Sequence, residues 1–191
     1  MRPYWRARRL PNPRRSLHRI VTDAIFALLL AAIILYATNE FAPFEEPANV
    51  SVVDGDTLKE GRQGIRLHGI DAPELHQNCN DARGELYGCG EEAKRALAVL
   101  VSGQIVQCRT VDSDRYRRKV SICRAGETNL NREMVRLGWA IAYRKHSLDY
   151  VGAENEARRN RRGVWQGWFE TPEDYRNSPH LEGGMRAPDD E

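Results

Sequence analysis

The stretch that decides the fold reads Val53-Asp54-Gly55-Asp56-Thr57-Leu58, then a spacer, then Ile65-Arg66-Leu67-His68-Gly69-Ile70-Asp71-Ala72-Pro73-Glu74. Asp54-Gly55 is a tight-turn pair, so the residues on either side of it are expected to be strands. Apolar and polar residues alternate over 65–70, with Ile65, Leu67 and Gly69 on one face. That strand ends before Pro73, which cannot continue it. Turns and strand ends can hold carboxylates open to solvent, as a hard metal ion or a polar substrate requires.

Each half of this stretch has a simpler interpretation, because Asp-Gly is a common turn and Asp-Ala-Pro-Glu fits a polar loop. Together, and in this order, the two halves resemble the staphylococcal nuclease-like (thermonuclease) family. The signature of that family is an Asp-Gly-Asp-Thr turn followed by an arginine-containing strand that ends in Asp-Thr/Ala-Pro-Glu. The resemblance covers roughly residues 49–176, which is most of the chain beyond its N-terminal segment.

The N-terminal segment has the layout of a membrane anchor or signal sequence. Residues 1–20 contain seven arginines and no acid, and residues 24–37 are an unbroken apolar run. We therefore expect one transmembrane or signal-anchor helix, with the N-terminus in the cytoplasm and the remainder exported. A cleavable signal peptide looks similar, but no good small-x-small cleavage site follows the run. The expected localisation is membrane-anchored with a periplasmic or other extracytoplasmic domain, or secreted if the segment is cleaved.

Charge is distributed unevenly, with a strongly basic N-terminus and a weakly acidic remainder. The net charge of +2 hides the basic N-terminus, since residues 39–191 carry 22 basic and 26 acidic groups, a net charge of −4. A generally basic surface therefore does not explain nucleic-acid binding, which would need a local cluster or a metal ion. We expect a basic N-terminus and anchor over 1–38, a linker over 39–48, a single domain over 49–177 and a disordered tail over 178–191.

Four cysteines follow the apolar run, and an even number in an exported domain predicts two disulfides. Three pairings are possible. A hairpin of the predicted strands 104–111 and 119–124 would place Cys108 opposite Cys123, so the expected pairs are Cys79–Cys89 and Cys108–Cys123. Zinc binding, with His68 or His76 completing the site, is the alternative, but the sequence contains no Cys-x-x-Cys.

Helices are expected over 91–101, 130–137 and 148–162, with a short strand-like link over 139–143. Short strands first and helices later predict an α+β fold, a small β-barrel with about three helices packed on it. This agrees with the OB-fold-type barrel of the family that the chain resembles.

Two carboxylates near a divalent cation can neutralise a phosphodiester, and calcium prefers oxygen ligands, so Ca2+ is the expected cofactor. Asp56 and Asp71 are the candidate ligands. The resemblance adds the main-chain carbonyl of Ala72, at a position where the family prototype has threonine. It also implies that Glu74 orients the attacking water and acts as the general base.

Arginine suits a phosphate because its planar fork donates to two oxygens and stays protonated. The resemblance implies that Arg66 is the first catalytic arginine. It implies that the second is Arg118, in the motif Asp114-Arg115-Tyr116-Arg117-Arg118. Arg117 replaces the glycine of this motif, so a turn with positive φ would be strained there. The expected substrate contacts are Arg115, Tyr116 and Tyr143.

The resemblance implies a calcium-dependent phosphodiesterase, an endonuclease that hydrolyses DNA or RNA outside the cytoplasm. We expect it to be a monomer that contacts the membrane through its N-terminal helix, with no protein partner evident. One alternative is a non-catalytic, membrane-tethered OB-fold module that binds nucleic acid or protein. The other is a disulfide-stapled structural domain of the cell envelope. Retention of Asp56, Arg66, Asp71, Glu74 and Arg118 argues against a non-catalytic member.

Overall fold

A computed structural model describes residues 13–40 and 43–178, and the chain divides into two units at residue 42. The first unit contains the helix α1 (Pro13–Glu40), of 28 residues. Eighteen of these, Arg19–Tyr36, are long and apolar enough to cross a membrane, and none of them is buried in protein. By length and composition this helix suits a signal segment or an anchor. Residues 1–12, residues 41–42 of the expected linker and residues 179–191 of the tail expected over 178–191 lie outside the described residues.

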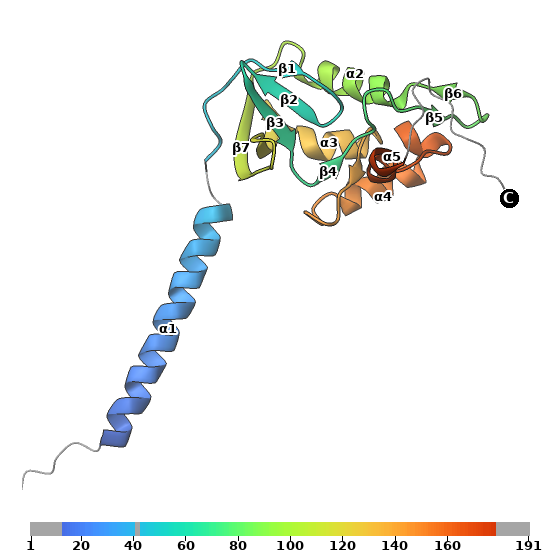
Figure 1. Ribbon diagram of the computed structural model, residues 1–191. Coiled ribbons are helices and arrows are strands. Elements are labelled where there is room, and N and C mark those ends of the chain that lie inside the picture. The colour runs from blue at the N-terminus through green and yellow to red at the C-terminus, as the bar shows by residue number, and fades with distance from the viewer. Residues whose placement is uncertain (1–12, 41–42, 179–191) are drawn as a thin grey trace, which may run out of the picture. The chain divides into compact units, whose positions relative to one another are not determined.

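The second unit is built on a six-stranded sheet (Figure 1). Its order is β1 (Ser51–Val52), β2 (Thr57–Glu60), β3 (Gln63–Leu67), β8 (Lys119–Ala125) and β7 (Val106–Ser113), with β9 (Thr128–Asn129) also on β8. β3 and β8 are parallel, and the other pairs are antiparallel. Two smaller sheets join β4 (Ile70–Asp71) to β10 (Ile141–Ala142) and β5 (Cys79–Asn80) to β6 (Leu86–Tyr87).

The predicted β-barrel is not closed within residues 43–178. The edge strands β1 and β7 do not pair with each other. Instead, the segment before β1 reaches β7. There Ala48 and Val106 exchange backbone hydrogen bonds of 2.9 and 3.2 Å, and the N–H of Glu45 donates to the carbonyl of Cys108 at 2.8 Å. Pro47 has no N–H to extend this pairing. The α+β class is correct, because sheets and helices share one core, whereas an OB-type barrel is not found.

The predicted helices correspond to α2 (Cys89–Val101), α3 (Leu130–Arg136) and α4 (Val151–Arg159). Their inner faces bury residues such as Leu97 and Met134 against Leu58 and Leu67 of the sheet. The expected number of three is too low. A 3-10 turn, η1 (Gly163–Gln166), and the short helix α5 (Pro172–Asn177) follow.

The predicted strand over 65–70 is interrupted by a turn. β3 ends at Leu67, and Gly69, with φ of +73°, redirects the chain into β4. A Cβ at Gly69 would lie 2.8 Å from the Cβ of Ser147, so only glycine fits this turn. As a result, Ile70 is also buried, although the alternation places it on the face opposite Ile65.

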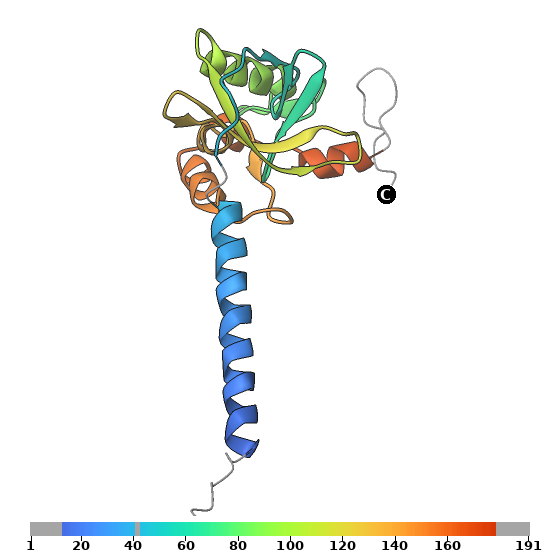
Figure 2. The ribbon, with the colours of Figure 1, turned by 90° about the vertical axis from the view of Figure 1, so that its left-hand side faces the viewer.

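Both predicted disulfides are confirmed. Cys79–Cys89 has a Cα–Cα distance of 5.6 Å, and Cys108–Cys123 one of 4.1 Å. Cys108 lies opposite Cys123 in the register of the long, twisted β7–β8 hairpin (Figure 2). With all four cysteines in disulfides, none is available to bind zinc.

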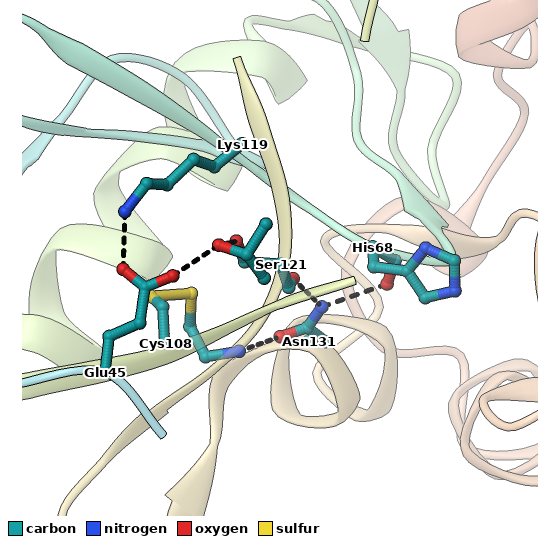
Figure 3. The surroundings of a disulfide bond; sticks show 8 residues. Glu45, His68, Cys108, Lys119, Ser121 and Asn131 are labelled. Carbon is teal, nitrogen blue, oxygen red and sulfur yellow. Dashed lines mark hydrogen bonds and ion pairs between the residues drawn. A yellow bond between two sulfur atoms is a disulfide. The ribbon is translucent and has the colours of Figure 1, made fainter. Parts of the chain in front are cut away.

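A polar network surrounds the second disulfide (Figure 3). The side chain of Asn131, on α3, accepts from the N–H of Cys123 at 3.0 Å and donates to the carbonyls of Ser121 and His68. Beside it, the carboxylate of Glu45 pairs with Lys119 and accepts from the hydroxyl of Thr110 at 2.6 Å. Glu45 belongs to the segment expected to be a linker, and it is bonded to both strands of the hairpin.

Candidate active site

Asp56 stands directly after the Asp54-Gly55 turn. The side chain of Asp54 accepts from the N–H of Asp56 at 3.0 Å, and the carbonyl of Thr57 accepts from the N–H of Val53 at 2.9 Å. A Cβ at Gly55 would lie 2.7 Å from the Cβ of Ala72, so the turn needs glycine to pack this closely. The turn therefore fixes Asp56 beside the end of β4, where Asp71 lies.

The two aspartates converge on one arginine nitrogen. Nη2 of Arg66 lies 3.0 Å from Oδ2 of Asp56 and 2.8 Å from Oδ1 of Asp71. Arg66 comes from the middle of the sheet, between Thr57 on β2 and Val120 on β8. Through these contacts Asp56, Arg66 and Asp71 form one charged centre, and both of its carboxylates are buried.

Burial destabilises the charged form of one carboxylate of this centre, Asp56. Burial raises the pKa of Asp56 to about 7, against the opposing effect of Arg66, and the charges of Asp54 and Asp71 raise it further. A buried carboxylate that is held partly protonated near neutral pH would gain from a further cation. Strong pKa perturbation of this kind is typical of functional sites.

The donor atoms suit a hard divalent cation. Within the described residues no three or more His, Cys, Asp and Glu side chains are arranged to hold a metal ion. The two aspartates nevertheless converge, since each has an oxygen about 3 Å from the same arginine nitrogen, and their oxygens are of the kind that calcium binds at about 2.3–2.6 Å. The buried Ala72 is adjacent, since its N–H donates to Oδ2 of Asp56 at 3.2 Å. Metal ligation by its carbonyl remains a prediction.

Glu74 lies on a loop that is fixed at several points. The side-chain oxygen of the buried Gln77 accepts from the N–H of Glu74 at 3.1 Å, and the N–H of Gln77 donates to the Glu74 carbonyl at 2.8 Å. A Cβ at Gly90 would lie 1.8 Å from the Glu74 carbonyl oxygen, so the first turn of α2 packs directly on this loop. The Cys79–Cys89 disulfide links the end of the loop to the start of α2.

Arg176 also belongs to this cluster and is not among the residues predicted from the sequence. The guanidinium of Arg176, on α5, reaches both oxygens of Asp71, at 3.1 and 3.0 Å, and Oε1 of Glu74 at 2.7 Å. The capped sequence Thr171-Pro172-Glu173-Asp174 could have revealed the helix. No local pattern indicates the contact, which spans 105 residues.

Arg118 does not contact these carboxylates within the described residues. Its Nε pairs with Oδ2 of Asp114 at 2.6 Å, and its side chain packs over Gly64, where a Cβ would lie 2.9 Å from Cγ of Arg118. The ring of Tyr116 faces the guanidinium groups of Arg115 and Arg118, at 4.9 and 5.6 Å. Three predicted residues therefore gather near the tip of the β7–β8 hairpin.

Arg117 has the positive φ that the missing glycine predicts, at 62°. Its N–H donates to the carbonyl of Asp114 at 3.0 Å, and its carbonyl accepts from Nε2 of Gln63 at 3.0 Å. These bonds hold a conformation that costs a non-glycine residue about 1–2 kcal/mol.

Tyr143 follows β10, and its N–H donates to the carbonyl of Gly69 at 2.9 Å. Its ring packs against His146, with the ring centroids 4.8 Å apart. The structure places Tyr143 beside the turn that leads to Asp71, without a described contact to the carboxylates.

A family model described as staphylococcal nuclease homologue matches residues 64–167, more than half of the chain. The matched range contains Arg66, Asp71, Glu74 and Arg118. Asp56 precedes it and Arg176 follows it.

Individual relatives agree with this match. The chain is 34% identical over 162 residues to succinoglycan biosynthesis protein ExoI of Rhizobium meliloti, which covers 83% of each protein. It is 33% identical over 159 residues to a micrococcal nuclease of Shigella flexneri, covering 74% of this chain and 85% of that protein. An uncharacterized endonuclease of Haemophilus influenzae is 33% identical over 148 residues, covering 72% and 78%. The chain belongs to the staphylococcal nuclease homologue family and is a nuclease, a hydrolase of nucleic acid.

Proposed function

We propose that the chain is a calcium-dependent endonuclease that cleaves DNA or RNA outside the cytoplasm. One observation carries this proposal: two buried aspartates converge on a single cationic atom, with Glu74 and Arg66 in the same cluster. The family is metal-dependent. Calcium is our choice of ion because all the candidate donors are hard oxygens.

Asp56, Asp71 and the carbonyl of Ala72 would hold the ion. A divalent cation at this place neutralises charge on the phosphate and on its transition state. The raised pKa of Asp56 supports this assignment, because a carboxylate destabilised by burial gains most from a cation.

Arg66 and Arg118 bind the phosphate in this proposal. Each guanidinium offers paired donors to two phosphate oxygens, and each would stabilise the additional charge of the five-coordinate transition state. For this role Arg118 leaves Asp114, a partner that is mostly shielded from solvent, and turns toward the phosphate.

Glu74 positions the attacking water and takes its proton. The water oxygen forms a bond to phosphorus while the P–O5′ bond breaks, and the departing 5′-oxygen takes up a proton to leave as a hydroxyl. A general base acts only within hydrogen-bond reach of the proton that it removes. The hydrogen bonds of Gln77 and the close packing of Gly90 fix the loop on which Glu74 sits. Arg115, Tyr116 and Tyr143 are the proposed contacts to the remainder of the substrate.

The proposed location follows from two features. α1 supplies a segment that is apolar and long enough to span a membrane, preceded by an arginine-rich flank that favours a cytoplasmic N-terminus. Two disulfides are typical of proteins that work in an oxidising compartment.

The test uses the purified full chain in detergent, with its disulfides intact, and a labelled single-stranded DNA. We expect cleavage with calcium, none with a chelator, and products that carry a 5′-hydroxyl. Cleavage that is equally fast in chelator would contradict the metal assignment. Asp56→Ala should raise the calcium concentration needed for half-maximal activity, and an unchanged requirement would remove Asp56 from the site.

A further inference from the structure

Arg176 holds the carboxylates that the proposed function gives to the metal and to the base. Its Nη1 and Nη2 lie 3.1 and 3.0 Å from the two oxygens of Asp71, and Nη1 lies 2.7 Å from Oε1 of Glu74. A forked contact to one carboxylate combined with a bond to a second is a strong and directional arrangement. It joins residues more than 100 positions apart.

The local structure places Arg176 there. Thr171 caps α5 by accepting from the N–H of Asp174 at 3.2 Å, and Pro172 is buried in the first turn. Nε2 of Gln77 donates to the carbonyl of Glu170 at 2.7 Å, while the other end of the same amide accepts from the N–H of Glu74. One buried glutamine therefore joins the loop of the base to the start of the segment that carries Arg176.

Asp71 has little capacity left for a metal ion in this arrangement. It is fully buried, its Oδ1 accepts from both Arg66 and Arg176, and its Oδ2 accepts from Arg176. A cation bound to Asp71 would compete for these lone pairs, and its charge would repel the guanidinium that already holds both oxygens.

A cation that binds Asp71 would displace the side chain of Arg176 more easily than that of Arg66. Its side chain is 34% exposed and comes from a six-residue helix after the last strand. The side chain of Arg66 is 23% exposed and comes from the centre of the sheet, with strands on both sides. Movement of Arg176 therefore requires no rearrangement of the core.

We propose that Arg176 is an internal counter-ion that competes with the divalent cation for Asp71. It thereby sets the metal concentration at which the site fills. Without metal, Arg176 neutralises Asp71 and restrains Glu74. Metal binding displaces its fork and frees both carboxylates for the reaction. This inference rests on the proposed function, because it assumes that Asp71 is a metal ligand.

The test is calorimetric titration of the full chain in detergent with calcium chloride, in the absence of nucleic acid. Arg176→Gln should bind calcium more tightly, by about tenfold, the factor that corresponds to one charge-assisted hydrogen bond of about 1.4 kcal/mol. Arg176→Lys keeps the charge but loses the fork, so its dissociation constant should fall between the two. Arg159→Gln makes the same charge change at an exposed position of α4 and should bind like the wild type.

Tighter binding distinguishes competition from a structural role, because a misfolded site would bind calcium more weakly. Thermal unfolding adds a second readout: Arg176→Gln should unfold at a lower temperature than wild type in chelator and show a larger stabilisation by calcium. Equal or weaker binding by Arg176→Gln would overturn the inference, provided that Asp56→Ala still loses binding; the proposed function would then stand. If wild type and Asp56→Ala both fail to bind calcium, the proposed calcium site itself is wrong, and this inference falls with it.

Discussion

Glu45 and Asp56 are both carboxylates that meet a cation from another part of the chain, and their surroundings differ. Glu45 is 40% exposed and has one lysine and one hydroxyl for itself. The hydrogen bonds from Lys119 and then Thr110 lower its pKa. The side chain of Asp56 is 6% exposed and shares Arg66 with Asp71, and burial raises its pKa.

The ion pair of Glu45 stabilises the fold, whereas Asp56 shares its cation with a second carboxylate and is buried. Glu45 has Lys119 as its own partner and is partly exposed to solvent, so the ionised form of its carboxylate is favoured. In the other cluster two guanidinium groups, those of Arg66 and Arg176, serve three carboxylates, and two of these, Asp56 and Asp71, are buried away from water. Buried charge that is incompletely matched reduces stability, and it binds a cation more strongly. Stability and cation binding are therefore opposed at this site.

The largest expected difference between the clusters is catalytic. Glu74→Gln should lower kcat by about 10²–10⁴-fold, since the amide cannot accept the proton of the attacking water. Calcium binding measured by calorimetry should persist. Glu45→Gln makes the same chemical change in the other cluster and should leave kcat unaltered. A similar loss of activity in both variants would show that the two clusters are not functionally distinct.

A smaller difference is expected in the pH dependence of stability without metal. The pKa of Asp56 in the folded protein, about 7, is above its ordinary value of 3.8, so the folded state binds the proton more tightly. Its contribution to stability is complete below about pH 4 and is lost as the pH rises toward 7. Asp56→Asn removes the charge. It should therefore stabilise the protein by on the order of 1–3 kcal/mol at pH 8 and have little effect at pH 4.

Glu45→Gln should show the opposite pH dependence. The pKa of Glu45 is lowered below 4.5, so its ion pair contributes above that pH and is lost as the pH falls through the lowered value. At pH 7 we expect a destabilisation of about 0.5–1 kcal/mol, because this pair is partly exposed. Urea unfolding in chelator at pH 4, 6 and 8 measures both variants. Parallel profiles for Asp56→Asn and Glu45→Gln would refute the contrast.

The smallest expected effect concerns the hairpin tip. Arg117→Gly removes a side chain from a residue with φ of 62°, so the variant should be more stable by about 1 kcal/mol, less the entropy that glycine adds to the unfolded chain. The backbone N–H of Arg118 donates to Oδ1 of Asp114 at 2.9 Å and does not depend on the side chain of Arg117, so the turn should persist and kcat should not fall. A variant that is less stable, or one that loses activity, would mean that the side chain of Arg117 has a role of its own.

The residues that the sequence analysis found lie within short motifs. Asp56, Arg66, Asp71 and Glu74 lie within 19 consecutive positions, where turn and strand patterns place the carboxylates at the ends of strands and the family resemblance implies the roles of Arg66 and Glu74. Cys108 and Cys123 could be paired because the register of a hairpin is set by its turn. These features depend on local geometry, which composition and periodicity describe well.

The features that could not be predicted from the sequence, such as the place of Arg176 in the site, depend on contacts between distant segments. Arg176 is one of many arginines in the sequence, and only the docking of α5 beside Gln77 makes it part of the site. Glu45 lies in a proline-containing acidic segment that is typical of a linker, and its bonds to β7 and β8 could not be read from that pattern. The strand predicted over 65–70 is longer than β3, which ends at Leu67, because alternation does not reveal the positive φ of Gly69.

The Cys79–Cys89 disulfide lies next to the loop that carries Glu74, and Sγ of Cys89 is 3.4 Å from the carbonyl of Gln77. A nuclease can endanger the cell that makes it, because that cell contains nucleic acid of its own. In the reducing cytoplasm these two cysteines remain thiols. If the domain is exported as proposed, the loop that carries Glu74 would lack its covalent link to α2 until the domain has crossed the membrane. On that proposal, the newly made enzyme should hold Glu74 less firmly before export than after the disulfide has formed.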